Sequence, residues 1–139
     1  METHITDIAH VIQLSVAPVF LLTAISTLIG AMNTRLGRII DRRRVVTETH
    51  AGKDMTPEDT EELALLARRR HLIYLAIFFA VAAALLVCFV VAGAFLGALM
   101  ATDLTRLVAA LFILAMGSMI AALSLFLREI YLAVSAASR

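Results

Sequence analysis

Residues 72–102 read LIYLAIFFAVAAALLVCFVVAGAFLGALMAT and contain no charged side chain. A helix needs about 20 apolar residues to cross a hydrocarbon core of about 30 Å, so this stretch is long enough to span a bilayer. Two further uncharged stretches, residues 11–32 and 107–127, meet the same requirement. The 139-residue chain is 61% hydrophobic with a mean hydropathy of +0.92, which is too apolar for an ordinary soluble domain. We therefore expect one all-α membrane domain over residues 1–139, with transmembrane spans at about 11–32, 72–101 and 107–127.

The polar segment between the first two spans, residues 33–71, decides the expected orientation. It holds nine of the twelve Lys and Arg residues of the chain. Basic segments next to spans stay in the cytoplasm. We therefore expect this segment and the C-terminus inside and the N-terminus outside. Tyr74 and Tyr131 then fall at the inner ends of their spans, where aromatic side chains suit the headgroup layer.

We expect residues 33–71 to form an antiparallel helical hairpin that continues the first two spans into the cytoplasm. Apolar residues recur at helical spacing up to a break at Gly52. Beyond the break, Thr56 and Pro57 are typical of the cap and the first residue of a new helix.

The return of the chain at Gly52 also predicts which side chains of the hairpin face each other. Opposite charges are expected to meet near the tip, namely Arg43 and Arg44 with Glu61 and Glu62. Closer to the membrane like charges are expected to meet, as at Arg38 and Arg68, with Arg35 near His71.

Eight arginines of this segment lie in two clusters beside the spans: Arg35, Arg38, Arg42, Arg43, Arg44, Arg68, Arg69 and Arg70. Anionic lipid headgroups are the partners that such juxtamembrane clusters attract most directly. A phosphate-bearing ligand or a cytoplasmic protein partner is the alternative. The net charge of only +1 does not favour a nucleic-acid partner. On the third span, Arg128 and Glu129 are expected near the inner interface, which the long side chain of Arg128 can reach.

A polar stripe on the first span is the main candidate for function. It consists of Gln13, Thr23, Thr27, Gly30 and Thr34. Steps of four and three residues place Thr23 to Thr34 on one helical face. Such a face can line a hydrated pore in an oligomer, or it can let helices approach and hydrogen-bond. Serine and threonine can also bond the carbonyls of their own helix, so the stripe alone leaves both interpretations open.

Small residues on the other two spans predict close helix packing. The candidates are Gly93, Gly97, Gly117 and Ala121. In lipid, small side chains let helix backbones approach and gain dispersion contacts. The pattern does not say whether that contact lies within one subunit or between subunits.

The sequence contains no residue pattern that favours catalysis. It has no HExxH, phosphate loop, GxSxG or cysteine pair, and no charge lies deep in a span. His4, Asp7 and His10 follow each other at three-residue steps, which spread side chains around a helix, so we expect no metal site there. We expect neither an enzyme nor a bound cofactor.

Three segments resemble a family of small bacterial membrane proteins, the domain of unknown function numbered twenty-seven twenty-one. They are residues 18–22 (PVFLL), residues 33–42 (NTRLGRIIDR) and Arg69-Arg70. The resemblance covers nearly the whole chain, and residues 35–42 are its most specific part. It implies a multi-pass protein of the bacterial inner membrane and transfers no catalytic or binding residue.

Two functional hypotheses follow from these patterns. The first is a homo-oligomer with the polar stripe at its axis, where the stripe would line an ion-conducting channel. The second is a non-conducting accessory or scaffold protein whose cytoplasmic hairpin docks a partner. A subunit of three spans is too small to enclose a pathway alone, so the first hypothesis depends on assembly.

Overall fold

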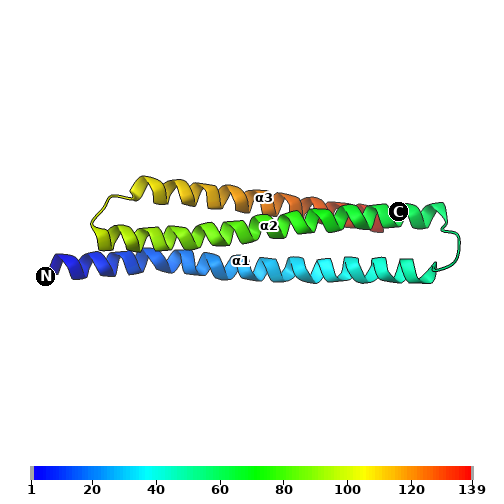
Figure 1. Ribbon diagram of the computed structural model, residues 1–139, viewed down its shortest axis with the longest axis horizontal. Helices are drawn as coiled ribbons and strands as arrows, with labels where there is room; N and C mark the ends of the chain where they lie inside the picture. The colour runs from blue at the N-terminus through cyan, green and yellow to red at the C-terminus, as the bar shows by residue number, and fades with distance from the viewer. Residues whose placement is uncertain (1, 139) are drawn as a thin grey trace.

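The protein consists of three long helices in an elongated antiparallel bundle (Figure 1). The computed structural model describes residues 2–138, without the side chains of Thr3, His4, Val11 and Ser15. The helices are α1 (Glu2–Thr49), α2 (Pro57–Met100) and α3 (Thr105–Ala137). All three are long and apolar enough to cross a membrane, which confirms the expected all-α membrane protein. The α1–α2 turn and the C-terminus lie at one end, here called the hairpin end, and the α2–α3 turn lies with the N-terminus at the other.

The first two helices extend far beyond their apolar segments. α1 continues without a break from residue 32 to Thr49, and α2 begins at Pro57, well before the uncharged stretch at residue 72. At about 1.5 Å per residue, α1 is about 70 Å long, more than twice the hydrocarbon thickness of a bilayer. Residues 33–71 therefore form the expected antiparallel hairpin, joined by a short turn.

Local sequence signals set the ends of that turn. Gly52 has φ of +82°, in the left-handed region that glycine adopts without a Cβ clash. Thr56 caps α2, because its hydroxyl accepts the Asp59 amide at 3.3 Å while the Asp59 carboxylate accepts the Thr56 amide at 3.2 Å. This capping box satisfies two amides that would otherwise lack partners, and Pro57 occupies the first helical position.

The core of the bundle lies along α2, which packs against both other helices. Alanines of α2, among them Ala76, Ala80 and Ala83, are fully buried against Ile25 and Met32 of α1 and against α3. Small side chains on the central helix let the two neighbours approach closely. Ser118 adds a hydrogen bond across this contact by donating to the Phe79 carbonyl at 2.6 Å.

The outer surface of the apolar segments is itself apolar. Large side chains that are at least half exposed include Phe20 on α1, Leu85 and Phe89 on α2, and Ile113 and Ile120 on α3. A water-soluble bundle would bury such residues, whereas lipid tails solvate them well. The bilayer is therefore the solvent of this surface.

Candidate functional site

A buried carboxylate joins all three helices at the hairpin end of the bundle. Glu129 of α3 is 0% exposed and is the one buried charged residue among residues 2–138. Its Oε2 accepts a hydrogen bond from Arg35 Nε of α1 at 2.9 Å. Its Oε1 accepts from Arg69 of α2, through Nε at 3.0 Å and Nη2 at 2.9 Å. Both carboxylate oxygens are thus satisfied, and we call this arrangement the Glu129 network.

The helical pattern explains why these side chains point inward. Arg35 lies three residues after Met32 and four before Ile39, both of which are buried on α1. Arg69 lies in the same way between Leu66 and Ile73 on α2. Residues three and four apart share a helical face, so both arginines occupy core positions.

Glu129 occupies the same kind of position on α3. It follows the fully buried Ala115 and Ala122 at steps of seven residues, which is two helical turns. Interpretation of the sequence placed Glu129 at the interface without a partner and Arg35 beside His71. The seven-residue spacing from Ala115 through Ala122 is the signal by which the sequence could have identified Glu129 as a core residue.

The network carries a surplus positive charge and holds the helices in a fixed register. Two guanidiniums share one carboxylate, and their side chains are 31% and 21% exposed for Arg35 and Arg69. The Arg35 guanidinium also lies 5.7 Å from the ring centre of Phe126, a favourable cation–π distance. Removal of one member of a buried ion pair is strongly destabilising, because the remaining charge is left without a partner.

Further polar contacts join the two arms of the hairpin towards its tip. Arg42 Nε donates to Glu62 Oε1 at 2.6 Å, one position from the pairing predicted for Arg43. The Glu62 carboxylate raises the pKa of Arg42 further above its ordinary value. Near the turn, His50 Nε2 lies 3.0 Å from Asp59 Oδ2. The Thr56 hydroxyl, through its hydrogen bond, holds the pKa of Asp59 below its ordinary value.

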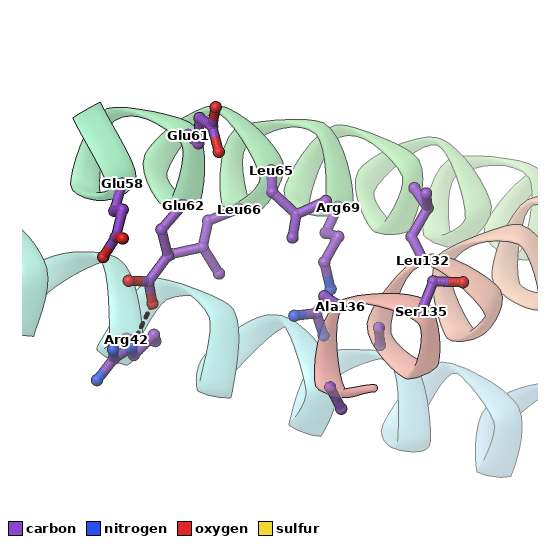
Figure 2. A pocket seen from close by; sticks show the side chains of 12 residues that line it. Arg42, Glu58, Glu61, Glu62, Leu65, Leu66, Arg69, Leu132, Ser135 and Ala136 are labelled. Atoms are coloured by element: carbon purple, nitrogen blue, oxygen red, sulfur yellow. Dashed lines mark hydrogen bonds and ion pairs between the residues drawn. The ribbon is translucent and has the colours of Figure 1, made fainter. Parts of the chain in front are cut away.

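A groove of about 700 Å³ opens where α3 ends at Ala137 and the hairpin continues alone (Figure 2). We call it the acidic groove. Its lining comprises Glu58, Glu61, Glu62, Leu65, Leu66 and Arg69 of α2, Arg42 of α1, and Leu132, Ala133, Ser135, Ala136 and Ala137 of α3. The lining combines leucine and alanine side chains with three carboxylates from α2.

The structure places the polar stripe of α1 on the surface facing away from α2. Gln13, Thr23, Thr27, Gly30 and Thr34 are all exposed. The three threonine hydroxyls donate to carbonyls of their own helix, at Val19, Thr23 and Gly30, over 3.0 to 3.1 Å. A Cβ built on Gly30 would meet nothing within 4 Å. Within one subunit, therefore, this face has no packing partner at Gly30.

The four small residues expected at helix contacts fall into two groups. A Cβ on Gly93 would lie 3.2 Å from Val108 Cγ2, and one on Gly97 would lie 3.3 Å from the Thr102 carbonyl oxygen. These two glycines therefore allow the α2–α3 turn and the start of α3 to pack on α2. Ala121 is half-buried, whereas Gly117 is exposed with open space around it.

The arginine clusters also divide into two groups. Arg35, Arg42 and Arg69 are committed to carboxylates. Arg38, Arg43, Arg44 and Arg68 are exposed, Arg70 is half-buried, and within residues 2–138 none of these five forms an ion pair.

The ligand types of a metal site do not converge in the described part of the chain. No three His, Cys, Asp or Glu side chains come together there. The side chain of His4, one of the residues considered above, lies outside the described part.

Comparison with known proteins identifies the family. No curated protein and no solved structure matches the chain. A family model described as protein of unknown function (DUF2721) matches residues 15–139, almost the whole chain. The chain therefore belongs to the DUF2721 family.

Proposed function

We propose that the protein is a non-catalytic homo-oligomer of the bacterial inner membrane, with α1 at the contact between copies and the hairpin in the cytoplasm. The uncovered polar face of α1 is the observation that carries this proposal. Its threonines and Gly30 are exposed in a segment that a bilayer would surround. Polar and small side chains at such positions gain packing and hydrogen bonds when another helix covers them.

The uncovered face continues along the whole hairpin arm of α1. From Thr23 onward, steps of four and three residues alternate through Thr27, Gly30, Thr34, Gly37, Asp41, Arg44 and Glu48. Helices that pack along their length contact each other at this spacing. All of these residues are exposed except Gly37, which is half-buried but has nothing within 4 Å of a built Cβ. Contact between copies would thus extend from the membrane into the hairpin.

An assembly of this kind supports conduction of cations along its axis. The hydroxyls of Thr23, Thr27 and Thr34 donate their protons to carbonyls of α1. The lone pairs of the hydroxyl oxygens therefore remain available on the outer face of the helix. Rings of oxygen acceptors replace part of the hydration shell of a cation. In this arrangement Asp41 lies on the same face as the stripe and brings a carboxylate to the inner mouth.

The native mass in lipid nanodiscs tests assembly through α1. We expect a single species of several copies for the unaltered protein. Gly30→Leu should reduce its mass, because leucine would separate the helices at the contact. Gly117→Leu is the matched control, since both glycines are exposed helical residues with open space around them. A monomer, or equal effects of the two substitutions, would contradict the proposal.

Conductance in planar bilayers tests the axial pathway separately. Thr27→Val keeps the shape of the side chain and removes its oxygen. We expect an unchanged native mass and a lower cation conductance. An assembly that stays intact but does not conduct would refute the channel and leave the oligomer.

The acidic groove favours a second function, in which the assembly is a non-conducting scaffold that holds a partner at the hairpin. Glu58→Ala and Leu65→Ala lie in the groove and should weaken capture of such a partner. Arg68→Ala, an exposed residue outside the groove lining, is the control.

A further inference from the structure

We infer that the acidic groove of one copy receives Arg43 and Arg44 of the neighbouring copy, so that the copies contact head to tail. This inference rests on the proposed homo-oligomer and names the surfaces by which its hairpins meet. Three observations carry it: the charge of the groove, the position of the two free arginines, and the common depth of both surfaces in the membrane.

The groove carries a surplus of negative charge although the hairpin as a whole is rich in arginine. Its two guanidiniums are already bound, Arg42 to Glu62 and Arg69 to Glu129. Glu58 and Glu61 form no ion pair within residues 2–138. The C-terminal end of α3 also closes one end of the groove, and its last turn contains no basic residue. The carbonyls of a helix C-terminus add partial negative charge there.

Two free guanidiniums lie on α1 outside the groove lining. Arg43 and Arg44 follow the groove residue Arg42 by one and two positions, and each position turns a helix by about 100°. Arg43 is therefore turned sideways from Arg42 and Arg44 lies nearly opposite to it, and both are exposed without an ion pair in the described chain. Asp41 and Glu48 share the face of Arg44, but neither is paired with it, so both guanidiniums are free to bind carboxylates through two parallel hydrogen bonds.

The membrane brings these arginines and the acidic groove together only between copies. Arg42 lines the groove, so Arg43 and Arg44 lie at the same depth along the bundle axis as the groove itself. Copies inserted in one orientation share that depth, and lateral contact then places the arginines of one copy beside the groove of the next. Copies that contact each other through two different surfaces form a closed ring when the rotation that relates neighbouring copies divides a full turn evenly. A soluble basic partner is not held at any fixed depth, so the matched depth favours a second copy of the chain as the occupant of the groove.

Cross-linking between two differently tagged copies tests the contact directly. In a Cys88→Ser background, one copy carries Arg43→Cys and the other carries Glu61→Cys, and the probe is a short bismaleimide. We expect cross-linked dimers only when the two variants are co-expressed, because a head-to-tail contact never places identical residues together. Thr60→Cys in place of Glu61→Cys is the control, since residue 60 lies outside the groove lining at almost the same depth. Dimers formed by either variant alone, or no mixed dimers from an intact oligomer, would overturn the inference.

Charge reversal provides an independent measurement. Glu58→Arg with Glu61→Arg, and separately Arg43→Glu with Arg44→Glu, should each raise the fraction of dissociated protein by about tenfold at low salt, which corresponds to about 1.4 kcal/mol. The two reversals combined in one chain should restore the native mass. Unchanged mass in both reversed variants would overturn this contact and leave assembly through α1 standing. A monomeric unaltered protein would instead refute the proposed homo-oligomer.

Discussion

The two ends of the bundle are held together in different ways. At the hairpin end, α1 is tied to α2 and α3 by the Glu129 network and to α2 by Arg42 and His50. At the other end, the helices meet through small apolar residues, and a second groove of about 730 Å³, lined by Leu14, Pro18 and Phe112 among others, opens between α1 and α3. Lipid tails compete well with apolar helix contacts, so packing within the membrane is weakly driven. Charged groups can set the register only where the helices leave the bilayer.

The largest expected effect comes from removing the shared carboxylate. Glu129→Ala leaves two inward-facing guanidiniums without a partner and should lower the free energy of unfolding by about 3–5 kcal/mol. Unfolding in increasing fractions of sodium dodecyl sulfate measures it. Arg128→Ala, at the neighbouring exposed position, should change the free energy of unfolding by less than about 0.5 kcal/mol.

A combined substitution distinguishes the loss of charge balance from the loss of packing. Arg35→Met, Arg69→Met and Glu129→Leu together remove every charge of the network while keeping side-chain volume. This variant should recover most of the stability lost in Glu129→Ala, because apolar groups of similar volume replace buried ion pairs at little cost. If the triple variant were as unstable as Glu129→Ala, the hydrogen bonds of the network would themselves stabilise the fold, beyond neutralising one another's charge.

A substitution at the opposite end tests the apolar contact. Gly97→Leu would place a side chain against the Thr102 carbonyl oxygen and Leu104, and should lower the free energy of unfolding by about 1–3 kcal/mol. The same unfolding measurement on Gly117→Leu, where space is open, should show no loss. No loss in Gly97→Leu would mean that the α2–α3 turn adapts to the larger side chain and that this contact contributes little stability.

The capping box at the start of α2 should have a smaller effect. Thr56→Ala removes the hydroxyl that accepts the Asp59 amide, and should lower the free energy of unfolding by about 1 kcal/mol. Hydrogen exchange should show faster opening of the first turn of α2 and unchanged protection around Glu129. Loss of protection at both places would contradict independent behaviour of the tip and the network.

The smallest effect concerns pH at the hairpin tip. The pKa of Asp59 lies below its ordinary value of 3.8, so the charged carboxylate stabilises the folded tip when the pH is above 3.8. This stabilisation is lost as the pH falls through the lowered pKa, and the Thr56 and His50 contacts weaken with it. Thermal unfolding between about pH 3 and 6 should show a decline that is shallower in Asp59→Asn. Asp54→Asn, in the same turn, should retain the full decline.

Much of the fold could be predicted from local signals. The uncharged stretches identified three membrane-spanning helices, and Gly52, Thr56 and Pro57 identified the turn and the start of α2. One facing pair of the hairpin, Arg42 with Glu62, lies one residue from the pairing predicted for Arg43. Such features depend on neighbours in the chain and on the chain's return at one turn.

The candidate site was harder to predict because it joins residues far apart in the chain. Arg35 and Glu129 are separated by 94 positions, and no periodicity within one helix says which face of α3 meets α1. The acidic groove likewise depends on where α3 ends relative to α2, because Ala137, Leu66 and Arg69 all line it. The position of that helix end beside α2 is set by tertiary packing.

The sequence by itself determined the solvent of the protein, the number of its helices and the position of its turns, because these follow from hydropathy and local capping. Only the tertiary structure decided which arginines are bound and which are free. It sets Arg35 and Arg69 around Glu129 and leaves Arg43 and Arg44 exposed. The physical reason is that a charge is held only by a partner within a few ångströms, and packing of the three helices chooses that partner.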